Sequence, residues 1–416
     1  MIRSPAGLVI ARLLSAALAL VTSPLIARAI GAEGRGLVAA ATTALMILPI
    51  GLAFGLPWAV RRRCSLDAQS HAVIRSARLL SLLTIVPGVG FAFLLYATLL
   101  SDLPEHAGVW FVVGLALTPL VVTRNCQISL LVVEQKYLRI LLVTLSQPAA
   151  YFVLILGLFI SSRLSVTAVI SSYVVSVGVS YLMTSRIVLI PWFGNRVSWR
   201  PLVGEAWRAS GAQISEIASY RLNQLLLLPL IGGAALGNYA VAVNIALAPA
   251  PIGHAVGAAG FKGMATGSEA DRRKSVDKSL RSAVWLAILS ALGVSALSPF
   301  VIPWAFGREF RSAIPATIVL AVGGVFVICN YVMTSGLVAR NQPGRASIVH
   351  FSGFIVGLVA LLLLSPPLGL MGAALASVIG FVATSVTASV FLRVGIGLWI
   401  PRLSHLRSSF SVLFGR

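Results

Sequence analysis

The sequence has 416 residues, of which 58% are hydrophobic and only 10% are charged, and its mean hydropathy is +0.95. These values lie outside the range of soluble globular domains, and no segment is long and polar enough to form a soluble catalytic domain. The net charge of +21 does not indicate a nucleic-acid-binding protein, because the basic residues are spread over connections between apolar stretches.

Apolar stretches of about 20 residues, the length that crosses a bilayer, recur along the whole chain. We therefore predict an all-α, polytopic membrane protein with about twelve transmembrane helices. The first stretch runs to Ile30 without a convincing cleavage site, so we interpret it as a retained span rather than a signal peptide. The predicted spans are 7–30, 37–60, 79–100, 108–133, 140–160, 166–189, 209–231, 237–261, 282–305, 313–338, 347–365 and 370–392.

The basic residues predict the orientation of these spans. Most of the 32 Lys and Arg residues fall in segments on one side, and the segments on the other side hold only Arg28, Arg35, Arg163, Arg308 and Arg311. The positive-inside rule then predicts a multi-pass protein of the cytoplasmic (inner) membrane with both termini in the cytoplasm. Three basic residues lie within predicted spans: Arg12, Arg124 and Arg221.

The chain also repeats itself. Ile30-Gly31 recurs as Ile231-Gly232, each pair after the first helix of its half, and the loop at 135–139 corresponds to the loop at 341–345. Offsets of about 200 residues with an even number of helices between copies indicate parallel repeats. We predict two six-helix lobes related by a pseudo-two-fold axis along the membrane normal. The lobes are residues 1–200 and residues 201–416, the second with a basic cytoplasmic tail.

The predicted span 209–231 carries several polar residues on one face of an otherwise apolar helix. At 100° per residue, these polar side chains occupy an arc of roughly 100° around the helix axis. They are Gln213, Glu216, Tyr220, Asn223 and Gln224, with Arg221 at the edge. Uncompensated polar groups cost several kcal/mol each in hydrocarbon, so this face points into protein or water and implies a cavity.

Arg124 lies too deep in its span for the guanidinium to reach the headgroups comfortably, and we interpret it as a substrate contact in this cavity. Arg12 is nearer the cytoplasmic end, so it either snorkels or lines the cavity mouth. Arg61, with the two arginines that follow it, either holds substrate phosphates at the entrance or anchors the topology. Arg28 and Arg35 flank an outside turn and are expected at the membrane interface.

Glu216 and Arg221 are five residues apart on their helix and therefore do not face each other. Each either forms a salt bridge to another helix or acts in function, with Arg221 meeting an anionic substrate and Glu216 balancing charge or taking a proton. The candidate substrate-binding residues are Arg12, Arg61, Arg124, Glu216, Arg221, Asn223 and Gln224.

Three stretches carry a family resemblance: LIARAIGAEGRGLVAAAT, SYRLNQLLLLPLIGGAALGNYAVAVNIA and LVARNQPGRASI. In this order they resemble the polysaccharide, or O-antigen-type, flippases of the multidrug/oligosaccharidyl-lipid/polysaccharide (MOP) exporter superfamily. The resemblance implies movement of isoprenoid-linked sugars across the cytoplasmic membrane. It departs at Arg221-Leu222-Asn223, where the family often has an acidic residue after the arginine, so cation coupling is not carried over.

An interior with arginines and almost no acids suits an anionic substrate, because exporters of cationic drugs need carboxylates to pair with their cargo. We predict a flippase, not an enzyme, that moves an isoprenoid-pyrophosphate-linked glycan to the outer face by alternating access for polysaccharide biosynthesis. Membrane lipid is the second expected partner. We also expect a functional link to glycosyltransferases and a polymerase, and no nucleic acid.

Two other functions stay open. A multidrug or small-solute exporter of the same superfamily would transport cations. A membrane polysaccharide polymerase or ligase would need a sizeable outside loop, whereas the longest outside connection, near Ser101–Ala107, is short. No cofactor is expected, since the sequence has no GxxxxGK[ST] loop, and the spacing of Cys64, Cys126 and Cys329 indicates neither a disulfide framework nor a metal site.

Overall fold

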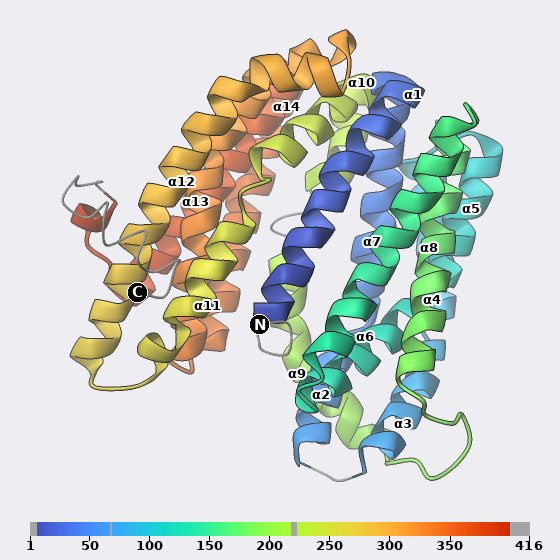
Figure 1. Cartoon of the computed structure of the whole chain (residues 1–416), viewed down its shortest axis with the longest axis vertical. Coiled ribbons are helices and arrows are strands. Elements are labelled where there is room, and N and C mark those ends of the chain that lie inside the picture. The colour runs from blue at the N-terminus through green and yellow to red at the C-terminus, as the bar shows by residue number, and fades with distance from the viewer. Residues whose placement is uncertain (1–5, 67–68, 218–222, 400–416) are drawn as a thin grey trace. The chain divides into compact units, whose positions relative to one another are not determined.

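The computed structural model describes residues 6–66, 69–217 and 223–399, and within them nearly all of the chain is helical with no strand (Figure 1). The first eight helices are α1 (Ala6–Leu52), α2 (Leu56–Leu66), α3 (Ser70–Leu82), α4 (Ile85–Thr98), α5 (Glu105–Ala116), α6 (Thr118–Val133), α7 (Tyr137–Ile160) and α8 (Val166–Ile187). The others are α9 (Trp199–Ile217), α10 (Asn223–Ala246), α11 (Pro251–Ala265), α12 (Glu269–Ala305), η2 (Arg308–Ser312), α13 (Ala313–Ala339), α14 (Pro343–Leu392) and η3 (Ile396–Leu398). The all-α membrane fold is therefore as predicted.

Three apolar helical stretches are too long for a single crossing, because about 20 residues span a bilayer. They are 40, 41 and 50 residues long and run over Leu13–Leu52, Leu225–Ala265 and Pro343–Leu392. A glycine with positive φ interrupts each one, at Gly31, Gly232 and Gly369. The first and third stretches each divide at their glycine into two halves long enough to cross, whereas Gly232 comes only seven residues after Leu225. α5 and α6, bent by 42°, together make one crossing, and the all-α fold with about twelve crossings is as predicted.

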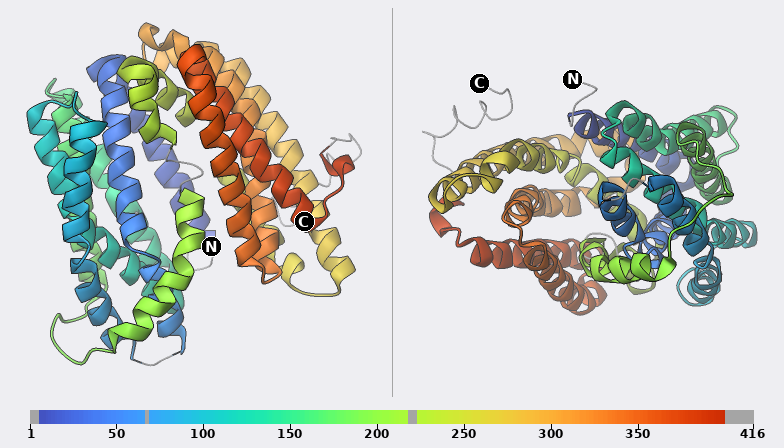
Figure 2. Two further views of the ribbon diagram at one scale, coloured as in Figure 1. Left: turned by 180° about the vertical axis from the view of Figure 1, so that it is seen from behind. Right: turned by 90° about the horizontal axis from the view of Figure 1, so that it is seen from below.

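Residue contacts divide the chain into two compact units. Unit 1 contains the described residues up to Ile217 together with Gln224–Pro229, and unit 2 contains Asn223 and the described residues from Leu230 on, so the division falls within α10. In unit 1, α7 packs against α1 and α8, and α2 packs against α6 and α9. In unit 2, α13 packs against α11, α12 and α14 (Figure 2). The lobe boundary at residue 200 stays a prediction.

Each unit has an apolar core of its own. Val60 and Val122 are fully buried in the core of unit 1, and Val332 and Val349 are fully buried in the core of unit 2. The cysteines belong to these cores as small apolar side chains, and all are buried and free: Cys64, Cys126 and Cys329.

Backbone conformation repeats at the glycines that mark the sequence repeat. Gly31 has φ 68° and ψ −177°, and Gly232 has φ 78° and ψ 168°. A positive φ with ψ near 180° is accessible in practice only to glycine. The two Ile-Gly pairs therefore share a physical cause, since each marks the same sharp break between two consecutive spans.

The loops after α6 and α13, which the sequence repeat pairs with each other, also match in structure. Gln135 and Asn341 adopt the left-handed conformation, with φ 54° and 58°. In each loop the following residue donates its backbone N–H to the carbonyl oxygen five residues earlier. The bond from Lys136 to Leu131 is 3.0 Å long, and the bond from Gln342 to Leu337 is 2.9 Å long. This closure is typical of the Schellman motif that ends helices. Matching turns at matching positions are what an internal duplication predicts.

The segment that joins α8 to α9 is held against α3 by two arginines. Arg78 is 3% exposed, donates from Nη1 to the carbonyl oxygen of Ile190 at 2.7 Å, and stacks over the Trp192 ring at 5.0 Å. Arg75 donates from Nε to the carbonyl oxygen of Pro191 at 3.1 Å. These two basic residues thus have a structural role beyond setting the topology, because they fix where α9 begins.

The two halves of α14 approach each other closely at Gly353 and Gly380. A methyl group added at Gly353 would lie 2.8 Å from the carbonyl oxygen of Gly380 and would overlap the side chain of Thr384. Gly353→Ala is therefore expected to destabilise the protein by about 1–3 kcal/mol, because the two helix halves must separate. The measurement is the melting temperature in detergent. Gly293→Ala in α12, where a methyl group would meet no atom within 4 Å, is the control, and equal melting temperatures would contradict the close approach.

Candidate functional site

Arg124, the arginine predicted to lie deep in a span, is half-buried on α6. Its Nη1 donates to Oε1 of Gln147 on α7 at 2.9 Å, and its Nη2 reaches the carbonyl oxygen of Val143 at 3.5 Å. Both acceptors are neutral, and none of the ion pairs among the described residues includes Arg124. The charge of Arg124 is therefore hydrogen-bonded within the described residues but not neutralised there.

Arg35 lies on α1, one turn after the break at Gly31, and is only 8% exposed. Its Nη2 donates to Oγ of Ser23 at 3.2 Å, and the phenol of Tyr151 on α7 lies nearby. Arg35 is therefore covered by protein, and its expected depth at the membrane interface stays a prediction. The break at Gly31 redirects α1, so that Ser23 and Arg35, twelve residues apart in sequence, meet inside unit 1.

Two tyrosines connect these arginines. The rings of Tyr151 and Tyr173 pack edge to face at 5.8 Å, and Tyr173 on α8 lies near Arg124 as Tyr151 lies near Arg35. Gln147 precedes Tyr151 by one turn of α7. We call Arg35, Arg124, Gln147, Tyr151 and Tyr173 the arginine–tyrosine cluster. Four helices of unit 1 supply it, α1, α6, α7 and α8, and they pack on one another.

The arginine–tyrosine cluster has the chemistry of an anion site. Each guanidinium carries five N–H donors, and the Nε of both Arg35 and Arg124 is buried without a hydrogen-bond partner among the described residues. Charges attract more strongly in a low-dielectric interior than in water. The planar fork of arginine matches phosphate oxygens in bidentate geometry, and the tyrosine hydroxyls add further donors. A phosphate-bearing ligand would satisfy the donors that the protein leaves unpaired.

Arg61, predicted as a substrate contact, lies on α2 with its guanidinium 4.7 Å from the centre of the Trp58 ring. Burial lowers the pKa of the Arg61 guanidinium from its ordinary value, but an arginine keeps its charge at neutral pH. Its neighbour Arg63 is engaged elsewhere, in a 2.8 Å ion pair with Glu205 of α9. Of the three consecutive arginines, one therefore joins α2 to α9, while Arg61 and the exposed Arg62 pair with no described carboxylate.

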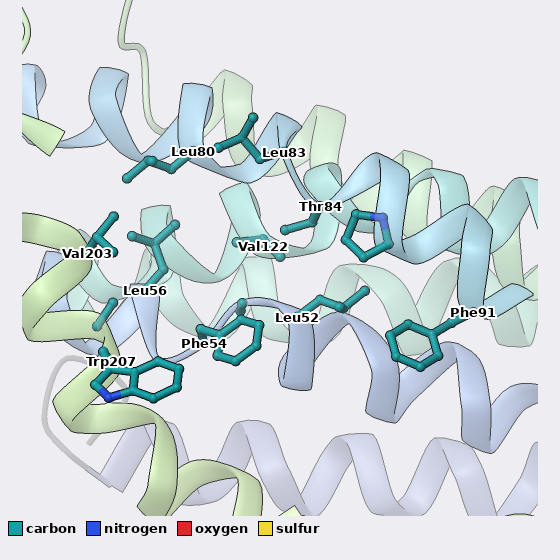
Figure 3. A pocket seen from close by; sticks show the side chains of 13 residues that line it. Leu52, Phe54, Leu56, Leu80, Leu83, Thr84, Phe91, Val122, Val203 and Trp207 are labelled. Atoms are coloured by element: carbon teal, nitrogen blue, oxygen red, sulfur yellow. The ribbon is translucent and has the colours of Figure 1, made fainter. Parts of the chain in front are cut away.

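An apolar pocket of about 510 Å³ lies beside α2 in unit 1 (Figure 3). Figure 3 shows the rings of Phe54, Phe91 and Trp207 around it, and the first and last of these rings stack at 6.0 Å. Apart from the indole N–H of Trp207, its polar side-chain group is the hydroxyl of Thr84, which already donates to the carbonyl oxygen of Ser81 at 2.6 Å. The pocket is of the size typical of ligand sites and suits a hydrocarbon group rather than a polar one.

The remaining predicted site residues cannot be placed. Arg221 lies outside the described residues, as do the side chains of Arg12, Glu216, Asn223 and Gln224. Their roles stay predictions. Within the described part of the chain, no group of three or more His, Cys, Asp or Glu side chains could hold a metal ion.

The sequence matches a protein family described as polysaccharide biosynthesis protein, over residues 3–253. No protein of curated function matches it.

Several solved structures are similar to this one at low sequence identity. The lipid II flippase MurJ, in an inward closed conformation, is 14% identical with a TM-score of 0.75, over 97% of this chain and 90% of that chain. An inward-facing multidrug resistance MATE family transporter of the MOP superfamily is 15% identical with a TM-score of 0.67, over 91% and 94% of the two chains. A MOP superfamily transporter from Pyrococcus furiosus, described as having a binding pocket of reverse polarity, is 14% identical with a TM-score of 0.58, over 92% and 93%. At these identities the matches establish a shared fold and nothing finer.

Proposed function

The chain belongs to the polysaccharide biosynthesis protein family of the MOP exporter superfamily, and from that membership we propose that it is a flippase for an isoprenoid-pyrophosphate-linked oligosaccharide. The substrate moves from the cytoplasmic to the outer face of the cytoplasmic membrane, for polysaccharide biosynthesis. Both termini lie in the cytoplasm, and glycosyltransferases and a polymerase act before and after the transport step.

The observation that carries this proposal is the arginine–tyrosine cluster. A charge inside a protein is costly without an opposite charge, so two covered arginines without a described carboxylate partner support a functional use of their charge. A pyrophosphate supplies several anionic oxygens in the geometry that guanidinium groups bind. We propose that Arg124 contacts this pyrophosphate. In the proposal the other substrate contacts are Arg12, Arg61, Glu216, Arg221, Asn223 and Gln224.

A lipid-linked substrate also needs room for a hydrocarbon chain. The apolar pocket beside α2 supports such a substrate, because its lining is almost entirely hydrocarbon. One of its lining residues, Leu56, belongs to the helix that carries Arg61. MurJ, whose fold this chain shares, is named as a flippase of lipid II. Both observations favour an amphiphile over a water-soluble solute.

The membrane potential is a sufficient source of energy in this proposal. The sequence has no phosphate-binding loop for ATP. A potential that is negative inside favours outward movement of an anion, by about 2.3 kcal/mol per charge per 100 mV. We propose alternating access, in which the pyrophosphate is bound from the cytoplasm and released outside.

Reconstituted vesicles test the proposal. Vesicles that contain the full chain are given a fluorescent polyprenyl-pyrophosphate oligosaccharide on one face, and its arrival on the other face is followed with a membrane-impermeant quencher. We expect movement that depends on the protein and that vesicles without protein lack. Movement of a cationic dye with no movement of the lipid-linked sugar would reject the proposal in favour of a multidrug exporter.

A further inference from the structure

A second pocket of unit 1, of about 590 Å³, shares no lining residue with the arginine–tyrosine cluster or with the apolar pocket beside α2. It lies where the loop between α6 and α7 meets the end of α8 and the start of α3. Four basic side chains and one acidic side chain line it: His71, Lys136, Arg139, Arg186 and Glu134. The remaining lining residues are apolar and come from α6, α7, the end of α8 and the chain after it. We call it the basic pocket.

The positive charge of the basic pocket is not cancelled by the protein. Its one carboxylate, on Glu134, pairs with Lys136 at 2.8 Å. Arg139 and Arg186 are both exposed and form none of the hydrogen bonds or ion pairs among the described residues. Two guanidinium groups are therefore free to bind an anion from outside the protein.

The start of α7 adds to this positive potential. The helix is 24 residues long and begins at Tyr137, and no side chain caps its first turn. The first N–H groups of a helix carry a partial positive charge and favour an anion nearby. Arg139 lies within that first turn, so the helix terminus and the guanidinium act on the same part of the basic pocket.

The apolar residues of the basic pocket indicate where the anion comes from. Leu138 is 43% exposed, Leu142 is 41% exposed and Leu189 is 78% exposed. Exposed leucines next to unpaired arginines form a surface that is apolar on one side and cationic on the other. A soluble anion gains nothing from the leucines, whereas a lipid with an anionic headgroup satisfies both kinds of residue.

We propose that the basic pocket binds an anionic glycerophospholipid, with its phosphate held by Arg139 and Arg186 and an acyl chain lying along Leu138 and Leu142. The predicted orientation puts these residues at the cytoplasmic leaflet, where basic pockets between helix ends meet lipid headgroups. The lipid is a stationary ligand of unit 1 and not the transported substrate. The inference therefore does not rest on the proposed function.

Native mass spectrometry of the full chain in detergent tests the inference, with dioleoyl phosphatidylglycerol as the probe. We expect the double variant Arg139→Gln and Arg186→Gln to bind this lipid about tenfold more weakly than the wild type, since a tenfold change corresponds to only about 1.4 kcal/mol. The corresponding double lysine variant should lose less, because it keeps the charge but not the bidentate geometry. Both arginines are exposed, so neither substitution should prevent folding, and size-exclusion chromatography checks this.

The control removes the same charge elsewhere. Lys274 and Lys278 are exposed on α12 of unit 2, in a segment predicted to lie on the same side of the membrane, and changing both to glutamine should leave lipid binding within about twofold of the wild type. Equal affinity of the wild type and the arginine double variant for phosphatidylglycerol would overturn the inference. So would equal binding of phosphatidylcholine to the wild type, or displacement of the lipid by millimolar inorganic phosphate, which would indicate a soluble anion.

Discussion

Arg124→Ala is expected to weaken binding of a polyprenyl diphosphate by about 30-fold or more. Arg124 is half-buried, and its partners Gln147 and Val143 offer only neutral oxygens. Removing one partner of a desolvated, hydrogen-bonded charge pair costs about 2–5 kcal/mol, and 1.4 kcal/mol is tenfold in affinity. Transport of the lipid-linked sugar into vesicles at limiting substrate should fall by a similar factor. The measurement is the initial transport rate per inserted protein.

The control for this variant is Arg163→Ala, which removes an exposed arginine from the loop between α7 and α8 of the same unit. It should transport at the wild-type rate. Arg124→Lys should fall between the two, because lysine keeps the charge but loses the planar fork. Full transport by Arg124→Ala, in protein that inserts and melts like the wild type, would mean that this guanidinium only stabilises α6 against α7.

The double variant Gly31→Ala and Gly232→Ala is expected to lose about 2–6 kcal/mol of stability. Each glycine has a positive φ with ψ near 180°, a conformation that costs other residues about 1–3 kcal/mol. The cost at Gly232 comes from the backbone alone, because a methyl group there would meet no atom within 4 Å. The two costs should add, because each arises from the φ and ψ angles of its own glycine. Thermal unfolding in detergent measures the loss as a lower melting temperature.

The matched control changes Gly157 and Gly293 to alanine. These glycines lie within α7 and α12, one in each unit, and also have open space around them. Alanine in a helix is favoured over glycine by about 1 kcal/mol, so the control should melt at or above the wild-type temperature. A double variant at Gly31 and Gly232 that melts like this control would show that the breaks between spans do not need glycine.

The crossings could be predicted from the sequence because hydropathy over about 20 residues is a local property. The repeat could also be predicted, since the conformations at Gly31 and Gly232 are ones that only glycine adopts readily, and such positions keep their residue type in both copies. The sequence predicts loops of several residues between these spans, whereas the structure turns from one span to the next at a single glycine in each case. Helix continuity depends on the angle at each glycine, and residue type alone does not determine that angle.

The arginine–tyrosine cluster was only partly predictable. The depth of Arg124 in an apolar span identified it, but the burial of Arg35 was not predicted, because it depends on how α1 turns at Gly31. Tyr151 and Tyr173 were not singled out. The signal that could have found them is a tyrosine near the middle of an apolar span, where its hydroxyl needs a partner. Helical periodicity predicts on which face of its helix a residue lies, but it does not predict which other helix packs against that face.

The arginines of α2 show the same limit. A run of three consecutive arginines predicts either phosphate binding or anchoring to the membrane surface, and the sequence cannot assign different roles within the run. The structure separates Arg63, which is bound to Glu205, from Arg61, which stacks on Trp58. That difference arises from the contact between α2 and α9, which are far apart in sequence.

The most direct test of the account is the preference of the protein for a diphosphate over a monophosphate on the same polyprenyl chain. Binding of both lipids to the wild type and to Arg124→Ala is measured by native mass spectrometry. We expect the wild type to prefer the diphosphate by about tenfold, equivalent to about 1.4 kcal/mol, and the variant to lose most of that preference. The same preference in both proteins, or none in the wild type, would contradict the claim that the arginines of unit 1 recognise a pyrophosphate.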